Sequence, residues 1–296
     1  MAGISSYCIA CILKRQEEQI RKFSDEQKKK EYMKEFCRIV GESKECDSAP
    51  VLVTYSAKLM KKYFGVEKVY TEEKKEYNTL MLKYEDEIRK KIAQADDSFK
   101  EALKYSRVGN YIDFGAMNHV EKNQLDVLLS KVQEDCVDEV EYQALLMDLR
   151  KARKLVFLTD NCGEIVLDKL FIEELKKYYP EIEITVIVRG EPVINDATME
   201  DAVFVGMDKV AYVMTNGTDT AGTPLDYISE EARKVLMEAD VILSKGQGNF
   251  ESLNGCGLNV YYLFLCKCDW FVQSFQMNLY EGVLVNEKNL SEKMNR

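Results

Sequence analysis

The stretch from Lys154 to Glu164, K-L-V-F-L-T-D-N-C-G-E, constrains the fold more than any other part of the chain. Its apolar, partly β-branched and aromatic residues predict a buried strand, and polar residues follow without a gap. Apolar residues at helical spacing from 165 to 178 then predict a helix, with Glu164 near its positive end. Strand, polar turn and helix in this order are typical of parallel α/β sheets, in which ligands bind at the carboxyl ends of the strands. An Asx turn that caps the helix would leave the same local pattern.

Composition limits the class of protein. With 296 residues, of which 46% are hydrophobic and 31% charged, the chain can bury a large core as one big domain or two coupled ones. The net charge of -10 disfavours nucleic acid as a partner, since basic surface is what binds a phosphate backbone. No apolar run reaches the length of a membrane span, and the first residues do not resemble a secretory signal. Nine scattered cysteines suit a reducing compartment, so we expect a cytoplasmic protein with no membrane partner.

The single histidine narrows the catalytic chemistry. His119 alone cannot build a multi-histidine zinc site. A Ser-His-Asp or Cys-His system would have to use His119 itself. Sites made of carboxylate and amide oxygens need no imidazole, and they stay open.

The sequence pattern changes once, near residue 153. Residues 1–152 are dense in Lys, Glu, Leu, Met and Tyr at helical spacing, which predicts an α-helical N-terminal region. One of its helices is predicted to begin after Ser48, with Pro50 in the first turn, and to end at Gly65. Residues 153–296 alternate strands with helices, which predicts an α/β region with a mainly parallel sheet. The expected strands span 155–158, 182–188, 210–214, 241–243 and 260–265.

Polar residues that can bind a ligand follow four successive predicted strands. They are Asp160-Asn161, Arg189 to Thr198, Thr215 to Asp219 and Ser244 to Asn249. The carboxyl ends of parallel strands meet at one edge of a sheet, so these residues are expected to lie close together. One such turn is a weak sign, but four at the same edge indicate a ligand site.

The residue types at this edge favour a hard cation and a phosphate. Asp160, Asn161 and Asp196 offer oxygen ligands, which suit Mg²⁺ or Mn²⁺ and suit zinc poorly. Lys245 lies in S-K-G-Q-G-N, where Gly246 lets the backbone approach an anion and the ammonium adds a positive charge. A solvated lysine at a strand end is an equally simple local interpretation of Lys245. A cation and a lysine together predict a clamp for a phosphate ester.

Two further motifs interrupt the helical region. Cys8 and Cys11 have the spacing that puts both thiols on one helix face, but Cys37, Cys46 and Cys136 supply no second pair for a zinc ribbon. Redox chemistry, another metal and plain packing all remain open for the pair.

The second motif is G-N-Y-I-D-F-G, residues 109–115. It predicts a loop that can present Asn110 and Asp113 to a ligand, although an ordinary interhelical turn has the same composition.

Several well-known nucleotide and phosphate motifs are missing from the sequence. There is no G-x-x-x-x-G-K-S/T loop and no G-x-G-x-x-G after the first predicted strand, which disfavours P-loop and dinucleotide-binding proteins. Cys162 stands two residues after Asp160, where a haloacid-dehalogenase-type phosphatase would carry a second aspartate.

The separate motifs resemble one family, the damage-control phosphatases, formerly called domain of unknown function 89 and including the acidic-residue methyltransferase-like proteins. The resemblance rests on D-N-C-G-E at 160–164, N-D-A-T at 195–198, the Gly109-Asn110 loop, G-T-P-L at 222–225 and S-K-G-Q-G-N at 244–249. These motifs span nearly the whole chain. The N-terminal C-x-x-C at residues 8–11 resembles the mark of the compact, mainly prokaryotic branch of that family.

The resemblance implies a Rossmann-like α/β domain, sandwiched by helices, with the helical N-terminal region packed on it. It also implies a metal-dependent phosphatase that hydrolyses phosphate monoesters of small metabolites, such as sugar phosphates or damaged phosphometabolites. By the same resemblance, Asp160, Asn161 and Asp196 are expected as ligands of Mg, Mn, Co or Ni. The expected catalytic residues are Asp160, Asp196 and Lys245, and the expected substrate contacts are Asn110, Asp113, Lys245, Gly246 and Asn249.

Two other functions fit the sequence less well. An S-adenosylmethionine-dependent carboxyl methyltransferase would carry a glycine-rich turn after the first strand, which D-N-C-G does not resemble. A non-catalytic metabolite-binding protein is the other alternative. The physiological substrate and metal, the oligomeric state, and the choice between water and a carboxylate as nucleophile are left open by the sequence.

Overall fold

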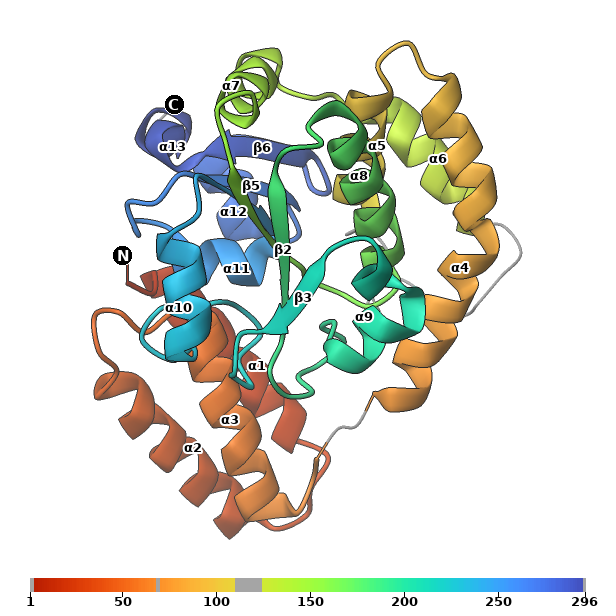
Figure 1. Cartoon of the computed structure of the whole chain (residues 1–296). Helices are drawn as coiled ribbons and strands as arrows, with labels where there is room; N and C mark the ends of the chain where they lie inside the picture. The colour runs from red at the N-terminus through yellow and green to blue at the C-terminus, as the bar shows by residue number, and fades with distance from the viewer. Residues whose placement is uncertain (1–2, 68–69, 110–123, 295–296) are drawn as a thin grey trace.

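The computed structural model of the protein describes residues 3–67, 70–109 and 124–294. In this part of the chain a sheet has the strand order β3-β2-β1-β4-β5-β6, with helices on both faces (Figure 1). Strands β1 to β5 are parallel, and β6 is antiparallel to β5. The strands are β1 (Lys154–Leu158), β2 (Glu183–Val188), β3 (Tyr212–Thr215), β4 (Val241–Lys245), β5 (Val260–Leu265) and β6 (Gly282–Asn286).

The described helices confirm the expected α/β class and the helix-rich N-terminal region. Before the sheet come α1 (Ser6–Ile20), α2 (Glu26–Gly41), α3 (Ala49–Phe64), α4 (Thr71–Gln94), α5 (Ser98–Gly109), α6 (Gln124–Glu134) and α7 (Glu139–Leu149). Between and after the strands come α8 (Glu164–Tyr178), α9 (Met199–Val205), α10 (Glu230–Met237), α11 (Gly246–Leu253), α12 (Asp269–Phe275) and α13 (Leu290–Met294), with short 3₁₀ turns η1 (Met207–Lys209) and η2 (Glu287–Asn289).

The helix predicted after Ser48 is α3, with Pro50 in its first turn. It ends at Gly65, which has a left-handed φ of 65° as expected for a glycine C-cap.

The centre of the sheet contains the point where the chain reverses its direction of travel across the strands. From β1 the chain moves outward through β2 and β3, and then returns to place β4 on the other side of β1. The segments that follow β1 and β4 therefore lie at the point of the carboxyl edge where the strand order reverses, which is the usual place for ligands in such folds.

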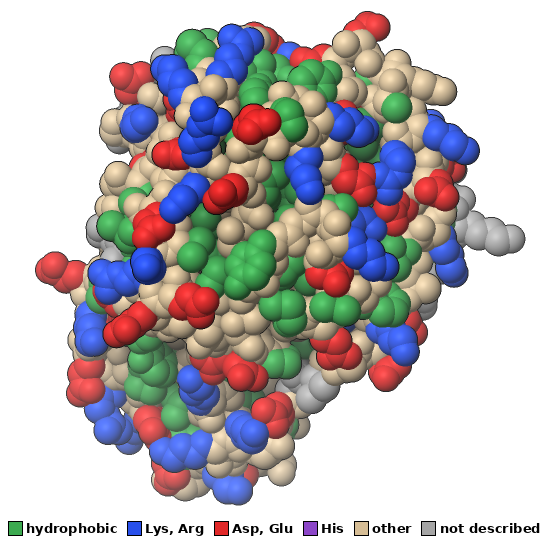
Figure 2. Space-filling model, viewed as in Figure 1, with side chains coloured by type: hydrophobic (Ala, Val, Ile, Leu, Met, Phe, Trp, Pro, Cys, Tyr) green, Lys and Arg blue, Asp and Glu red, His purple; other side chains and the backbone are tan. Residues whose placement is uncertain are grey.

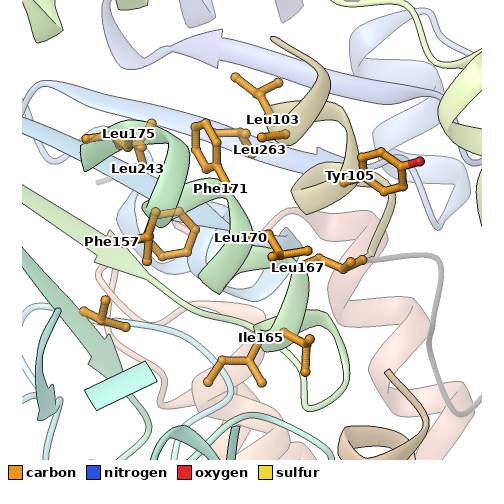
Figure 3. Packing of buried hydrophobic residues seen from close by; sticks show 14 of the residues in the cluster. Leu103, Tyr105, Phe157, Ile165, Leu167, Leu170, Phe171, Leu175, Leu243 and Leu263 are labelled. Atoms are coloured by element: carbon orange, nitrogen blue, oxygen red, sulfur yellow. The ribbon is translucent and has the colours of Figure 1, made fainter. Parts of the chain in front are cut away.

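Helix α8 is the main packing element behind this edge. Its buried residues Leu170 and Phe171 belong to one core cluster with residues of the sheet and of helix α5 (Figure 3). The Phe171 ring lies 5.2 Å from the ring of Phe99 and 6.3 Å from that of Phe157, measured between centroids. Because α8 follows β1 directly, this packing fixes the position of the polar turn between them.

The N-terminal helices divide between two hydrophobic clusters. Residues of α1, α2 and α3, including Tyr32, Phe36 and Leu52, form a cluster of their own. Residues of α4 to α7 instead belong to the same cluster as the buried side chains of α8 and the sheet. Half of the helical region therefore shares its core with the sheet. The division of the chain into regions 1–152 and 153–296 stays a prediction.

Strand β6 is absent from the sequence-based expectation of five strands. The chain reaches it after α12 through Gln276 and Tyr280, which both have positive φ, of 53° and 65°. The backbone N–H of Tyr280 donates to the carbonyl of Cys266 at 2.7 Å and begins the antiparallel pairing with β5. Non-glycine residues with positive φ carry no clear sequence signal, so the reversal was missed.

The face of the molecule drawn in Figure 2 carries lysine, arginine and acidic side chains intermixed. Among the described residues, no helix is long and apolar enough to cross a lipid bilayer.

Candidate active site

The turn after β1 and the loop after β2 meet through their backbones. The N–H of Cys162 donates to the carbonyl of Asn195 at 2.9 Å, and the N–H of Ala197 donates to the carbonyl of Asp160 at 2.8 Å. Asn161 and Asp196 form an isolated antiparallel bridge between the two segments. The expected ligands Asp160, Asn161 and Asp196 are therefore neighbours, although Asp160 and Asp196 are far apart in the sequence.

The side chains of these residues form one polar cluster. The amide nitrogen Nδ2 of Asn161 donates to Asp160 Oδ2 at 2.8 Å. Nε of Arg189, the residue that follows β2, donates to Asp196 Oδ2 at 2.5 Å, and its Nη2 lies 3.7 Å from Asp160 Oδ1. The guanidinium therefore faces both carboxylates and offsets part of their charge.

Arg189 also connects the loops of Asp196 and Gly222 with helix α11. Its Nη1 donates to the carbonyl of Gly222 at 2.9 Å and to Oδ1 of Asn249 at 2.8 Å. Only 2% of its side-chain surface is exposed. Its Nη2 is buried and has no hydrogen-bond partner in the described part of the chain. A buried guanidinium needs hydrogen-bond and ionic partners to be stable. The contacts of Arg189 with Asp196, Gly222 and Asn249 therefore hold these two loops and helix α11 together.

Gly246 allows β4 to end directly against Asp160. Its φ is 77°, in the left-handed region where side chains are strained. A Cβ atom added at residue 246 would lie 2.1 Å from Asp160 Oδ2, which is far inside van der Waals contact. The glycine predicted to admit close backbone approach thus brings α11 against a carboxylate of the site.

Burial disfavours the ionised form of the Asp160 and Asp196 carboxyl groups. It raises the pKa of the Asp160 carboxyl to about 8. The nearby carboxylates of Asp196 and Glu164 act in the same direction, and the cations of Arg189 and Lys267 act against it. The pKa of Asp196 is also raised by burial, although Arg189 opposes the shift. A cation bound here would relieve this cost, because it favours the ionised carboxylates.

Lys245 lies in a buried ionic network beside the carboxylate cluster. Its Nζ donates to the carbonyl of Ser106 at 2.7 Å, to Oδ1 of Asp168 at 2.7 Å and to Oε1 of Glu164. Neither Lys245 nor its two acidic partners have exposed side-chain surface. Burial lowers the pKa of Lys245, but the two carboxylates outweigh it, so that its pKa is raised. Burial raises the pKa of Asp168 to about 7.

The donor set fits a hard divalent cation. In residues 3–67, 70–109 and 124–294, no three acidic, thiol or imidazole side chains gather around one point. A cation at this cluster would be held by the carboxylates of Asp160 and Asp196 and the amide oxygen of Asn161, with water or substrate in the remaining positions. Such an all-oxygen set suits Mg²⁺ or Mn²⁺.

Comparisons with known proteins identify the family. The sequence profile of the damage-control phosphatase ARMT1-like domain matches residues 4–283. The chain belongs to this family. It is 32% identical over 284 residues to a damage-control phosphatase of Archaeoglobus fulgidus, covering 93% of this chain and 96% of that one. It is 30% identical over 229 residues to a damage-control phosphatase of Pyrococcus horikoshii, covering 77% of each chain. An uncharacterized protein of Methanocaldococcus jannaschii is 30% identical over 300 residues, covering 95% of both chains.

A solved structure confirms the fold of the family. The crystal structure of a domain-of-unknown-function-89 protein from Pyrococcus horikoshii superposes with a TM-score of 0.81 and covers 97% of this chain and 100% of that chain, at 23% identity. The names of the relatives support a phosphatase, and therefore a hydrolase, as the function of the damage-control phosphatase family.

The expected substrate contacts of this family member fall in different places. Gly246 adjoins Asp160, whereas Asn249 is fully buried. Oδ1 of Asn249 accepts from Arg189 and Thr223, and its Nδ2 donates to two backbone carbonyls, those of Thr159 and Lys245. All of these hydrogen bonds of Asn249 are made inside the protein and connect segments around the site. Its direct contact with substrate stays a prediction.

Asn110 and Asp113 lie outside the described residues, as does His119.

Sequence reasoning did not single out three residues that shape this site. Arg189 lies in a polar run noted after the second strand, and a cation directly after a buried strand was its available signal. Ser106 and Asp168 lie in helices α5 and α8, and no local pattern connects them with Lys245. The sequence places Glu164 only near the start of the helix after β1, yet it also accepts a hydrogen bond from Asn161 Nδ2 at 3.2 Å.

The cysteines play different parts in this family member. Cys162 is buried, and burial raises the pKa of its thiol, which does not suit a nucleophile. Burial raises the pKa of Cys8 to about 11, and its Sγ lies 4.0 Å from a carboxylate oxygen of Glu251. Cys11 is exposed.

Proposed function

We propose that this protein is a divalent-metal-dependent phosphatase that hydrolyses phosphate monoesters of small metabolites, such as sugar phosphates or damaged phosphometabolites. The observation that carries the proposal is the cluster of Asp160, Asn161 and Asp196 at the carboxyl edge of the sheet, where the strand order reverses, in a chain of the damage-control phosphatase family. A small phosphorylated metabolite is the proposed partner. A cytoplasmic location stays a prediction from the cysteine content.

Asp160, Asn161 and Asp196 would hold the cation, and Mg, Mn, Co and Ni all accept this oxygen set. A cation bound there supplies Lewis-acid stabilisation of the charge on the phosphoryl oxygens. Arg189 keeps Asp196 in place through the 2.5 Å hydrogen bond to its Oδ2. Gly246 has no side chain that would collide with the Asp160 carboxylate. The Asp160 side chain is 13% exposed, so a ligand can reach it from solvent.

The attacking group is either water or a site carboxylate, and the two routes leave different products on the enzyme. An ionised carboxylate would bond to phosphorus as the bond to the ester oxygen breaks, which forms a phospho-aspartate and releases an alcohol after the oxygen gains a proton from solvent; water would then hydrolyse the phospho-aspartate to phosphate and the free carboxylate. Acid quenching during turnover of a labelled phosphoester distinguishes the routes, because only the carboxylate route leaves phosphate bound to the protein.

The decisive experiment is a screen of phosphoester hydrolysis with Mg²⁺, Mn²⁺, Co²⁺ and Ni²⁺, followed by a panel of sugar phosphates. We expect metal-dependent phosphate release that Asp160→Asn and Asp196→Asn abolish. Asp240→Asn is the matched control, since Asp240 caps the opposite end of β1 by accepting from the N–H of Lys154 at 2.9 Å. It should retain activity.

Full turnover in Asp160→Asn would refute the site assignment. Inactivity of the wild-type protein with every metal would favour a metabolite-binding role. Tight binding of S-adenosylmethionine without metal would favour a methyltransferase.

A further inference from the structure

The ammonium group of Lys245 has no hydrogen left for a ligand. A lysine ammonium carries three N–H donors. In this structure Nζ donates to Ser106, Glu164 and Asp168, and the Lys245 side chain is fully buried. A phosphate at Lys245 would have to displace a carboxylate or a backbone carbonyl from a site without solvent access.

The network around Lys245 is built by two helices behind the sheet. Glu164 and Asp168 lie four residues apart on α8, so their carboxylates share one helix face and repel each other. Ser106 of α5 adds its carbonyl to Lys245 and its hydroxyl, at 2.7 Å, to Asp168 Oδ1. Lys245 offsets the repulsion and fixes the rotamer of Glu164, because the pair is buried and directly hydrogen-bonded.

Glu164 connects Lys245 with the proposed metal site through hydrogen bonds. One oxygen, Oε1, accepts from Lys245, and the other, Oε2, accepts from Asn161 Nδ2 at 3.2 Å. The same Nδ2 donates to Asp160 Oδ2 at 2.8 Å. The amide nitrogen is thus held between two carboxylates. A flipped amide would turn its oxygen against both of them, so the network selects the orientation that leaves Oδ1 for a cation.

We propose that Lys245 is a positioning residue that acts through Glu164 on the amide of Asn161, and that it orders the metal site instead of contacting phosphate. The proposal rests on the proposed function, since it takes Asn161 as a metal ligand. It differs from the sequence-based expectation that Lys245 binds phosphate. Partners that orient metal ligands typically change metal affinity by 10- to 100-fold when they are removed.

Two titrations distinguish the roles in Lys245→Met. Calorimetry of Mn²⁺ binding to the metal-stripped protein should show affinity reduced by about tenfold or more. Titration of inorganic phosphate into the Mn²⁺-loaded variant should give the wild-type affinity. Unchanged Mn²⁺ affinity together with weakened phosphate binding would overturn the proposal, because that result is expected of a lysine that contacts phosphate.

A second pair of variants covers the case in which Lys245→Met does not fold. Glu164→Gln keeps the shape of the side chain but weakens the link to Asn161, and should lower Mn²⁺ affinity by about tenfold or more. Glu141→Gln is the matched control, because Glu141 is also a buried hydrogen-bonded glutamate but accepts from Asn286 and Asn289 and not from Lys245 or Asn161. Equal Mn²⁺ affinities in the two variants would overturn the proposal.

The readouts also separate this proposal from the proposed function. Mn²⁺ binding with the expected loss in Glu164→Gln, but without hydrolysis of any phosphoester, would refute only the phosphatase. Absence of Mn²⁺ binding by the wild-type protein would refute both.

Discussion

Replacement of Gly246 by alanine tests how closely the backbone must approach Asp160. The left-handed φ of 77° costs an alanine about 1–2 kcal/mol. The added Cβ would lie 2.1 Å from Asp160 Oδ2 and 2.2 Å from its Cγ, so the carboxylate has to move. Forced packing of this kind costs about 1–3 kcal/mol more. We therefore expect a total destabilisation of about 2–5 kcal/mol, together with displacement of Asp160.

Gly257→Ala is the matched control for this variant. Gly257 has a φ of 76°, and no atom lies within 4 Å of the position of an added Cβ. It should lose only the backbone term of about 1–2 kcal/mol. The difference between the two alanine variants therefore measures the contact with Asp160.

Urea unfolding with and without Mn²⁺ checks both consequences. A ligand at a hundred times its dissociation constant stabilises the native state by about 2.7 kcal/mol. We expect that increment in Gly257→Ala and its loss in Gly246→Ala. Equal stabilities and equal Mn²⁺ increments in the two variants would refute the reasoning.

Three further predictions concern charge. Arg189→Met leaves Asp196 buried without its cation and should destabilise the protein by about 3–5 kcal/mol in denaturant titrations; a loss below about 1 kcal/mol would contradict the assigned ion pair. Because a proton must leave Asp160, whose pKa is raised to about 8, calorimetric Mn²⁺ affinity should rise with pH between about 6 and 8, and a flat profile would argue against Asp160 as a ligand. Burial raises the pKa of Glu251 from 4.5 to about 7, so its ionisation removes stability as pH rises through that range, and Glu251→Gln should exceed wild type by up to about 3 kcal/mol at pH 8 and match it at pH 4 in urea unfolding. A pH-independent difference would contradict the Glu251 prediction.

The sheet and the meeting of its strand ends were predictable from local patterns. The β1 stretch is a run of buried apolar residues, and the helix after it has clear periodicity, so strand and helix were placed within one residue of the structure. Asp160 and Asp196 could be connected because parallel strands must present their carboxyl ends at one edge. The prediction required only topology.

The network of Lys245 could not be predicted in this way. Its acceptors come from α5 and α8, and their contacts with Lys245 of β4 depend on how the helices pack on the sheet, which no local pattern specifies. The sequence shows a lysine beside glycines, and the same letters describe a phosphate-binding lysine and a buried one. Strand β6 was missed for a related reason, because its pairing depends on a reversal at Tyr280, where a non-glycine residue has positive φ.

The most direct test of the central claim is Mn²⁺-dependent phosphate release by the wild-type protein and Asp196→Asn, measured on the same samples as Mn²⁺ binding. Asp196 is the proposed ligand that the fold brings to Asn161 from a distant loop. The proposed site predicts that the substitution removes both Mn²⁺ binding and phosphate release. Wild-type Mn²⁺ affinity and turnover in Asp196→Asn would contradict it.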